Sequence, residues 1–358
     1  MTDPLPPGST IGILGGGQLG RMLSVAAARL GYRTHVFEPA PDCPAADTAH
    51  RVTTAGYDDR AALTAFAASV AVITYEFENI PESALDLLEA SRPVRPSRHA
   101  LATSQDRIAE KDFLTALGLT TAPYARVDTL DDLRHALARI GTPAILKTTR
   151  LGYDGKGQVR ITSAGAADAA FADMAGAPAV LEGFVDFSHE ISVIAARALD
   201  GSVAAFDPGE NVHRDGILHT TTVPARIAAT LHSDAVLIAA RILNALQYVG
   251  VIGVELFVTP AGLIVNEIAP RVHNSGHWTQ NGCAVDQFEQ HIRAIAGLPL
   301  GDGSRHSDIV MENLIGDDIL GLPALLKQKN CAIHLYGKAQ SRPGRKMGHV
   351  NRVGIEKV

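Results

Sequence analysis

The sequence predicts an α/β protein in which a parallel sheet opens the chain and antiparallel strands follow it. The first observation is the opening. A short apolar strand over 10–14, a glycine-rich turn, helical spacing over 21–30 and a second strand over 32–37 form a βαβ unit. The second observation is the stretch 250–271, where a Pro/Gly turn separates two apolar, β-branched runs, as in a β-hairpin. A length of 358 residues allows two or three domains around these elements.

The composition is that of an ordinary soluble globular protein, with 46% apolar and 20% charged residues. The net charge of −6 argues against nucleic acid or an anionic membrane as a partner, and no apolar run approaches the ~20 residues of a membrane span. Residues 1–7 lack the basic start and apolar core of a signal peptide, so we expect a cytoplasmic protein. The thiols Cys43, Cys283 and Cys331 fit a reducing compartment and predict neither a disulfide framework nor a zinc site.

Gly15, Gly17 and Gly20 follow the first strand in a G-x-G-x-x-G pattern. Glycines at this spacing let the backbone approach a phosphate at a helix N-terminus, where N–H groups and the helix dipole favour an anion. Glu38 ends the next strand, where an acid binds the ribose in dinucleotide-binding folds. Taken alone, the pattern predicts NAD, although another phosphate or no ligand is equally compatible with it.

A strand predicted over 70–75 ends in two acids, Glu76 and Glu78. Because ligands of open α/β sheets bind at the carboxyl ends of strands, these acids are placed to meet one. The alternative is that both are solvated loop residues. Two prolines within 92–97 break regular structure and indicate a boundary there.

A glycine-rich flap is predicted at 152–158, between a strand that ends on Lys147 and a strand over 159–161. The connection is longer than a tight hairpin needs, and its N–H groups, with Lys147 and Lys156, could cover a polyphosphate. It is not a Walker loop, because Gly-Lys-Ser/Thr is missing and a strand follows. A plain flexible hairpin is the alternative.

The hairpin at 250–271 carries two acids, Glu255 and Glu267, that we expect to face each other. A three-residue loop, Pro260–Gly262, with Gly262 in the left-handed conformation, would place them directly opposite, with Cβ atoms roughly 5 Å apart. Two carboxylates this close repel unless one is protonated or a cation lies between them. With Asn266 beside them, the oxygen-rich set suits Mg²⁺. Two exposed acids are the alternative, but the apolar flanks favour a buried sheet and therefore the metal.

Polar and cationic stretches follow this hairpin. Arg271 opens the stretch 271–279, which predicts an anion site because a guanidinium can hold an oxyanion bidentately; a polar loop without a ligand is the alternative. The cationic side chains within 338–346 form either a solvated face or a phosphate clamp. His213 and His219, six residues apart, are also considered as a pair of metal ligands.

Several motifs together resemble the ATP-grasp carboxylate–amine ligases, and within them the branch that carboxylates an aminoimidazole nucleotide. The motifs are Gly-Gly-Gly-Gln-Leu-Gly-Arg-Met at 15–22, Phe-Glu-Asn at 77–79, Gly-Tyr-Asp-Gly-Lys-Gly-Gln at 152–158, Pro-Arg-Val-His-Asn-Ser-Gly-His-Trp-Thr at 270–279 and the tail 336–349. The strand-end lysine, the Glu-x-x-Val sequence at 182–185 and the Asn-Glu pair at 266–267 are similar to the same family. The likeness runs nearly end to end, with its motifs in order.

The resemblance implies an ATP-grasp fold of three parts. These are an N-terminal Rossmann-like parallel-sheet domain at 1–105, an ATP-grasp region at 106–296 with a lid at about 122–186, and a C-terminal antiparallel segment at 297–358 that completes the substrate site. It also implies the reaction: ATP, bicarbonate and 5-aminoimidazole ribonucleotide give the N5-carboxylated nucleotide, ADP and phosphate through carboxyphosphate, in de novo purine (IMP) biosynthesis. Mg²⁺ or Mn²⁺ would assist, and the family suggests a homodimer.

The resemblance also assigns roles by position. The ATP-binding residues implied are Arg107, Lys147, Gly152, Tyr153, Asp154, Gly155, Lys156, Gly157, Gln158, Glu182, Gly183, Phe184, Val185, Glu190, His213, Asn266 and Glu267. Those implied for the substrate and bicarbonate are Gln18, Leu19, Glu76, Tyr153, Asp154, Arg271, His273, Asn274, Ser275, Lys338 and Arg345. The implied catalytic residues are Asp154, Lys156, Arg271 and Lys338, and the implied metal ligands are Glu255 and Glu267.

Some points stay open at this level. We expect Asp154, on the flap, to orient the amine or accept its proton, while the acid that faces the amine in the 76–79 stretch is undecided. The competing functions are an NAD-dependent oxidoreductase, a nucleotide-binding regulator without turnover, and a sister ligase with another acceptor. The oxidoreductase leaves the flap, the acid hairpin and the basic tail without a task, and a regulator need not keep a full phosphoryl-transfer set.

Overall fold

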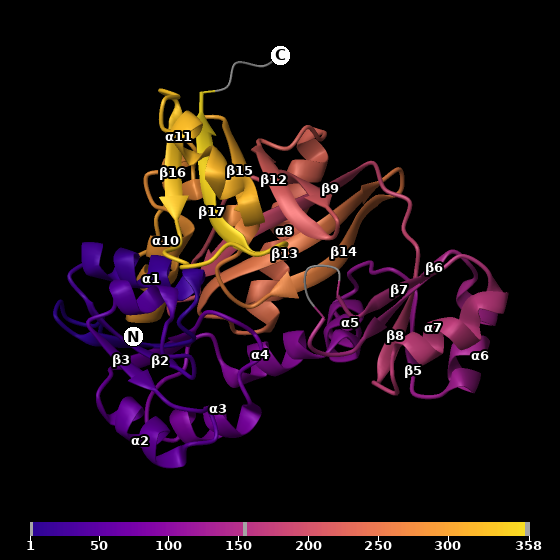
Figure 1. Cartoon of the computed structure of the whole chain (residues 1–358), viewed down its shortest axis with the longest axis horizontal. Helices are drawn as coiled ribbons and strands as arrows, with labels where there is room; N and C mark the ends of the chain where they lie inside the picture. The colour runs from indigo at the N-terminus through magenta and orange to yellow at the C-terminus, as the bar shows by residue number, and fades with distance from the viewer. Residues whose placement is uncertain (1–2, 153–155, 355–358) are drawn as a thin grey trace.

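A computed structural model describes residues 3–152 and 156–354 and confirms the predicted α/β class. The described residues form three sheets, each with helices beside it. In Figure 1 the N-terminal sheet lies at one end, the small sheet of β5–β8 at the other, and the large C-terminal sheet between and above them. Across the described ranges, no helix has the combined length and apolar character needed to cross a membrane.

The first sheet is parallel, as the βαβ opening predicted. Its strands, in spatial order, are β3 (Arg51–Thr54), β2 (Arg33–Glu38), β1 (Thr10–Leu14) and β4 (Val72–Tyr75). Its helices are α1 (Gln18–Arg29), α2 (Arg60–Ala68) and α3 (Glu82–Glu89). Residues 11–14 of β1 and all of β4 are buried, as expected for strands covered on both faces. Two helices, α4 (Arg98–Gln105) and α5 (Arg107–Ala116), lead from this sheet to the rest of the chain.

The second sheet is antiparallel and falls within the range expected for the lid. Its strands, in spatial order, are β5 (Tyr124–Val127), β8 (Ala179–Gly183), β6 (Ala144–Thr148) and β7 (Gln158–Ile161), with helices α6 (Leu130–Ile140) and α7 (Ala167–Asp173). Both ends of helix α6 are specified by local sequence. Thr129 and Asp132 form a reciprocal capping box, and Gly141 takes a positive φ of 88° after the last turn.

The third sheet has nine strands and carries the acid hairpin at one edge. They are β14 (Gly262–Ala269), β13 (Gly250–Thr259), β9 (His189–Arg197), β11 (Gly209–Arg214), β12 (Ile217–Val223), β15 (Ile309–Ile315), β17 (Lys346–Val353) and β16 (Cys331–Leu335) in spatial order, with β10 (Val203–Ala205) beside β9. The helices are α8 (Ala229–Ala245), α9 (Thr279–Gly282), α10 (Gln287–Ala296) and α11 (Leu322–Leu325). The 3₁₀ turns along the chain are Pro44–Asp47, Ala164–Ala166, Asn274–Gly276 and Gly316–Gly321. Because β15 pairs with β12, the C-terminal strands extend the same sheet.

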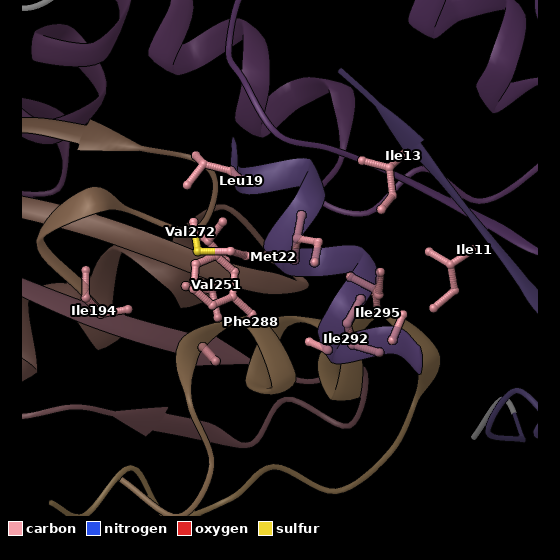
Figure 2. Packing of buried hydrophobic residues seen from close by; sticks show 14 of the residues in the cluster. Ile11, Ile13, Leu19, Met22, Ile194, Val251, Val272, Phe288, Ile292 and Ile295 are labelled. Atoms are coloured by element: carbon pink, nitrogen blue, oxygen red, sulfur yellow. The ribbon is translucent and has the colours of Figure 1, made fainter. Parts of the chain in front are cut away.

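The first and third sheets share one core. Figure 2 shows Leu19 and Met22 of α1 packed toward Phe288, Ile292 and Ile295 of α10, and all five side chains are buried. Burying a side chain of this size contributes roughly 1.5–3 kcal/mol. This packing fixes the N-terminal glycine turn relative to the large sheet.

The hairpin confirms the pairing of Glu255 with Glu267 but not the predicted loop. Thr259 pairs with Gly262, so the loop has two residues and the expected three-residue loop is wrong. Gly262 does have a positive φ, of 118°. A β-bulge restores the expected pairing, because the register shifts by one residue at Asn266, between the pairs Leu256–Val265 and Glu255–Glu267.

Candidate active site

A cleft of about 590 Å³ opens between the three sheets, within the size range of small-molecule sites. Each sheet and its connections contribute to the wall: Gln18 and Glu76 from the first, Lys147 from the second, and Glu255 and Glu267 from the third. The carboxyl end of β4 and the N-terminus of α1 both reach it. This is where ligands of open α/β sheets bind.

Glu255 and Glu267 lie in the cleft wall on the same face of the hairpin, as predicted. The bulge adds Asn266 to the same wall, and its Nδ2 lies 3.5 Å from Glu255 Oε2. Burial and the negative charge of Glu267 raise the pKa of Glu255 to about 7. Burial opposes ionisation of Glu267 too, but the charges of Arg107 and Lys147 lower its pKa. The two carboxyl groups therefore differ: nearby cations favour ionisation of Glu267, whereas burial and the charge of Glu267 oppose ionisation of Glu255.

Cations from α5 and β6 lie around this pair. Arg107 Nη1 is 3.1 Å from Glu267 Oε2, so the guanidinium reaches from α5 to the edge strand. Lys147 Nζ is 2.9 Å from Glu182 Oε2, and Lys111 Nζ is 3.2 Å from Glu182 Oε1. Burial alone would raise the pKa of Glu182, but the two lysines lower it. Glu182 therefore stays ionised behind the cleft wall and holds Lys147 toward the cleft.

Two hydrogen bonds in series connect the sheet behind the cleft to His273, whose ring lies beside Glu255. Ser192 Oγ donates to Ser275 Oγ at 2.6 Å, and Ser275 Oγ lies 2.8 Å from His273 Nδ1. His273 Nε2 lies 3.5 Å from Glu255 Oε1. Burial and the charge of Arg271 lower the pKa of His273 to about 3, so the ring is neutral. With Nδ1 accepting from the serine, the remaining N–H faces the carboxylate.

Glu190 and His213 form a second pair in the cleft, with 2.5 Å between Glu190 Oε2 and His213 Nδ1. Burial works against protonation of the ring, but the bond to Glu190 and its charge raise the pKa of His213. His219 lies near Glu312 instead, with 3.9 Å between Nε2 and Oε1, and does not line the cleft. Among the residues that the structure describes, no three His, Cys, Asp or Glu side chains are grouped to hold a metal, so His213 and His219 gain no support as a ligand pair.

The N-terminal glycine turn is filled by the protein's own carboxylates. Glu76 accepts hydrogen bonds from the N–H groups of Gly17 and Gly20, the second at 2.6 Å, and Glu38 accepts from Gly16 at 2.7 Å. Burial raises the pKa of Glu76. The position that a pyrophosphate takes in a dinucleotide fold is therefore occupied, and Glu38 binds the turn rather than facing a ribose. This geometry does not fit the NAD interpretation of the glycine motif.

Glu78 differs from Glu76 in its partner. Its carboxylate accepts from Arg271 Nε at 2.5 Å and from Arg271 Nη2 at 2.9 Å, a bidentate pair. Burial opposes ionisation of Glu78, but the charge and hydrogen bonds of Arg271 lower its pKa. Of the two acids after β4, Glu78 is thus engaged by the guanidinium that was predicted to hold an anion.

The structure brings most of the predicted site residues to one cleft. Those lining it are Gln18, Leu19, Glu76, Arg107, Lys147, Gly152, Lys156, Gln158, Glu190, His213, Glu255, Asn266, Glu267, Arg271, His273 and Asn274. Those that do not line it are Gly157, Glu182, Gly183, Phe184, Val185, Ser275, Lys338 and Arg345. Tyr153, Asp154 and Gly155 lie outside the described residues.

Several residues of the second group have contacts of another kind. The ring of Phe184 lies 4.5 Å from the guanidinium carbon of Arg160, as in a cation–π contact. Lys338 Nζ donates to the carbonyl of Lys346 at 2.8 Å, and Lys346 itself lines the cleft. Arg345 Nη1 donates to the carbonyl of Gln340 at 2.9 Å.

Among the residues near the site that sequence reasoning missed are Glu110, Lys111, Phe187 and Phe257. Glu110 and Lys111 of α5 follow Arg107 by three and four positions, so helical spacing places them on the same face. Phe187 and Phe257 stack in the cleft with ring centroids 4.5 Å apart and 14° between planes. Phe257 stands two residues from Glu255 on β13, and the period of two along a strand could have identified it.

Three models of known protein families match successive parts of the chain. A model of the ribonucleotide synthetase preATP-grasp domain matches residues 9–105, a model of the ATP-grasp domain matches 112–288, and a model of the phosphoribosylaminoimidazole carboxylase C-terminal domain matches 309–357. An N5-carboxyaminoimidazole ribonucleotide synthase of Brucella melitensis is 58% identical over 352 residues, covering 98% of this chain and 97% of that protein. The chain belongs to the N5-carboxyaminoimidazole ribonucleotide synthase family. The Bacillus subtilis member is 41% identical, with 96% of this chain and 91% of the relative covered.

Solved structures of the family share the whole fold. An ADP complex of an N5-carboxyaminoimidazole ribonucleotide synthetase matches with a TM-score of 0.96 and 42% identity, covering 99% of this chain and 95% of the other. The Aspergillus clavatus enzyme in complex with ADP and 5-aminoimidazole ribonucleotide matches with a TM-score of 0.91 and 31% identity, covering 97% and 94%. These matches confirm the predicted ATP-grasp fold and make the chain an ATP-grasp ligase.

Proposed function

We propose that this ligase carboxylates the amine of 5-aminoimidazole ribonucleotide, using ATP and bicarbonate, in de novo purine (IMP) synthesis. The observation that carries the proposal is the facing pair Glu255 and Glu267, set in one cleft with Arg107 and Lys147. Two acidic and two cationic side chains in one cleft are suited to phosphoryl transfer, because there the protein mainly positions the reacting groups and neutralises their charge.

The nucleotide would lie between the lid and the large sheet. Phe187, Phe257 and Ile145 give the cleft an apolar and aromatic wall suited to adenine. Glu190 would accept hydrogen bonds from the ribose. Lys147 would contact the phosphates, and its ammonium is already held in place by Glu182.

The residues present fit a divalent cation. Glu255 and Glu267 would be the protein ligands, with Asn266 beside them, because Mg²⁺ is commonly held by one or two carboxylates plus phosphate oxygens and water. The raised pKa of Glu255 indicates a site short of positive charge, which a dication would supply. When bound, Mg²⁺ or Mn²⁺ would neutralise charge on the β- and γ-phosphates.

The reaction would then run in two steps. A bicarbonate oxygen attacks the γ-phosphorus of ATP and ADP leaves, which gives carboxyphosphate. The amine next attacks the carboxyl carbon, the C–O bond to phosphate breaks, and the amine loses a proton. Gln18, Leu19 and Glu76 would bind the nucleotide substrate, while Arg271 and His273 would form the wall for bicarbonate.

Several roles are kept as parts of this proposal. The flap at 152–158 would cover the cleft and exclude water, because carboxyphosphate hydrolyses readily. Asp154 would orient the amine or take its proton, Lys156 and Lys338 would take part in catalysis, and Arg345 would bind the ribose phosphate. We also propose that the chain divides into domains after residues 105 and 296, that residues at about 122–186 form the lid, and that the protein is a homodimer.

The test is ADP release measured with ATP–Mg²⁺ in four mixtures: with or without the aminoimidazole nucleotide, each with or without bicarbonate. The proposal predicts full turnover only when both are present. Equal ADP release in all four mixtures would contradict it, and stimulation by another amine or acid in place of the nucleotide would indicate a sister ligase. In parallel, ATP–Mg²⁺ and not NADH is expected to raise the melting temperature, since a ligand of the native state stabilises it.

A further inference from the structure

Gln287, the first residue of α10, binds the wall of the cleft from behind. Its side chain is fully buried, and Oε1 accepts from the backbone N–H of His273 at 2.9 Å. Its Nε2 donates to the carbonyl of the same residue at 2.7 Å. One primary amide thus pairs with both backbone groups of His273, as a neighbouring strand would.

The same amide also fixes the next turn of the loop. Gln287 Nε2 lies 3.0 Å from His277 Nδ1, and the backbone N–H of Gln287 donates to Thr279 Oγ1 at 3.0 Å. Thr279 Oγ1 in turn donates to the carbonyl of Gly276 at 2.7 Å. A Cβ atom on Gly276 would lie 2.7 Å from Gln287 Oε1, so glycine is required for this approach. The loop from His273 to Thr279 is therefore folded onto the start of α10.

We call the two hydrogen bonds between the Gln287 side chain and the His273 backbone the Gln287 clamp. The clamp matters for the cleft because His273 lines it beside Glu255. Its imidazole is the link between the Ser192–Ser275 pair and Glu255, with Nε2 3.5 Å from the carboxylate. Its neighbour Asn274 also lines the cleft and forms a reciprocal amide pair with Asn313, at 3.0 and 2.7 Å. A shift of the His273 backbone would move the ring away from Glu255.

We propose that Gln287 is a positioning residue that holds the wall 271–277, and through His273 the bicarbonate side of the cleft, in its working geometry. Gln287 does not line the cleft, so it acts only through the loop. Its effect on turnover rests on the proposed carboxylation, whereas its effect on the loop does not.

The chain offers a matched control on the same helix. Gln290 is also fully buried, and its amide clamps another backbone segment in the same manner: Nε2 donates to the carbonyl of Gly301 at 2.7 Å, and Oε1 accepts from the N–H of Gly301 at 2.8 Å. Neither Gln290 nor Gly301 lines the cleft. Gln287→Met and Gln290→Met therefore remove comparable buried hydrogen bonds, and only the first removes them from the wall.

The experiment measures kcat, the KM for bicarbonate and the Kd for ADP in the intact chain and in both variants. We expect Gln287→Met to lower kcat/KM for bicarbonate at least about 10-fold, because small misplacements of reacting groups have large effects on rate. The affinity for ADP should stay within about twofold, and Gln290→Met should match the intact chain in all three quantities. Equal kinetics of the two variants would overturn the proposal.

Two further measurements keep the result decisive. Gln287→Glu has nearly the same shape and keeps the acceptor for the His273 N–H, while it loses the N–H donor. If Gln287→Met does not fold, unchanged kinetics of Gln287→Glu would overturn the proposal. Crystal structures of the variants provide a readout independent of the reaction: displacement of the His273 ring from Glu255 in the Gln287 variant alone supports the clamp, and an unmoved loop overturns it. If the intact chain has no carboxylation activity, the proposed function fails and this structural readout still decides the clamp.

Discussion

Position 17 needs a glycine because the carboxylate of Glu76 occupies the space that a Cβ atom would take. A Cβ built on Gly17 would lie 2.5 Å from Glu76 Oε1, and the backbone of Gly17 has an ordinary φ of −73°. Steric space, and not a special conformation, therefore requires glycine at this position. The N-terminus of α1 receives its anion from the protein itself.

Gly17→Ala is therefore expected to push Glu76 from the turn and to lower the free energy of unfolding by about 1–3 kcal/mol, because buried N–H groups lose their acceptor. Urea unfolding measures the change. Gly165→Ala is the control, since no heavy atom lies within 4 Å of its Cβ position. Equal stability of the two variants would mean that Glu76 does not depend on the space beside Gly17.

Single residues show what the sequence could and could not predict. Apolar patterning placed Lys147 and Glu76 within one residue of a strand end, because the apolar run marks the extent of a buried strand. Their partners did not follow. Glu182 on β8 binds Lys147 on the neighbouring strand β6, and Glu78 binds Arg271, which is 193 positions later in the sequence. Contacts between residues this far apart in the sequence are set only by the assembled fold.

The hairpin β13–β14 shows the same limit at the level of an element. The expected pairing of Glu255 with Glu267 is correct, although the loop has two residues rather than three. A bulge at Asn266 compensates for the shorter loop. Its position depends on packing in the finished sheet, which the sequence pattern alone does not report.

Helix α5 secures the outer edge of this hairpin. Glu110 is buried, and its Oε1 accepts the backbone N–H of Ile268 on edge strand β14 at 2.5 Å. Burial and the charge of Glu267 raise the pKa of Glu110 to about 8. The side chain thus satisfies an edge-strand donor next to Glu267.

Glu110→Ala should lower the free energy of unfolding by about 1–3 kcal/mol, since the Ile268 N–H would be buried without a partner. Glu110→Gln keeps an oxygen acceptor and should lose less. Chemical unfolding of the two variants beside the intact chain measures this difference. Equal losses for the Gln and Ala variants would contradict this account, because they would show that an oxygen acceptor for the Ile268 N–H does not stabilise the edge.

At the scale of the whole molecule, a buried neutral histidine forms hydrogen bonds to both the first and the third sheet. His291 of α10 accepts the N–H of Val251 on Nδ1 at 3.1 Å, and its Nε2 lies 2.8 Å from Thr74 Oγ1 on β4. It therefore connects the first sheet to the third. Burial lowers the pKa of His291 to about 3, and burial likewise lowers the pKa values of His277 and His349 far below the ordinary value.

This arrangement predicts a loss of stability in acid. Because the folded pKa of His291 lies below its unfolded value, its contribution is complete above about pH 6.5 and declines as the pH falls toward about 3, by on the order of 1 kcal/mol per pH unit. Glu110 and Glu255, whose pKa values are raised, act in the opposite direction over the upper part of this range. Urea unfolding of the intact chain and of His291→Gln between pH 7.5 and 5 isolates the one histidine. We expect the intact chain to lose stability relative to the variant as the pH falls, and a difference between the two proteins that does not change with pH would contradict the assignment.

We propose that Glu255 and Glu267 face each other in order to hold a divalent cation against the phosphates of ATP. The most direct measurement is ADP release with the aminoimidazole nucleotide, bicarbonate and Mg²⁺ for Glu255→Gln and Glu267→Gln, beside Glu89→Gln on the outer helix α3 as the control. The account predicts a loss of roughly 100-fold or more in both hairpin variants and no loss in the control, because the cation contributes several kcal/mol of transition-state stabilisation. Turnover within about threefold of the intact chain in either hairpin variant would contradict it.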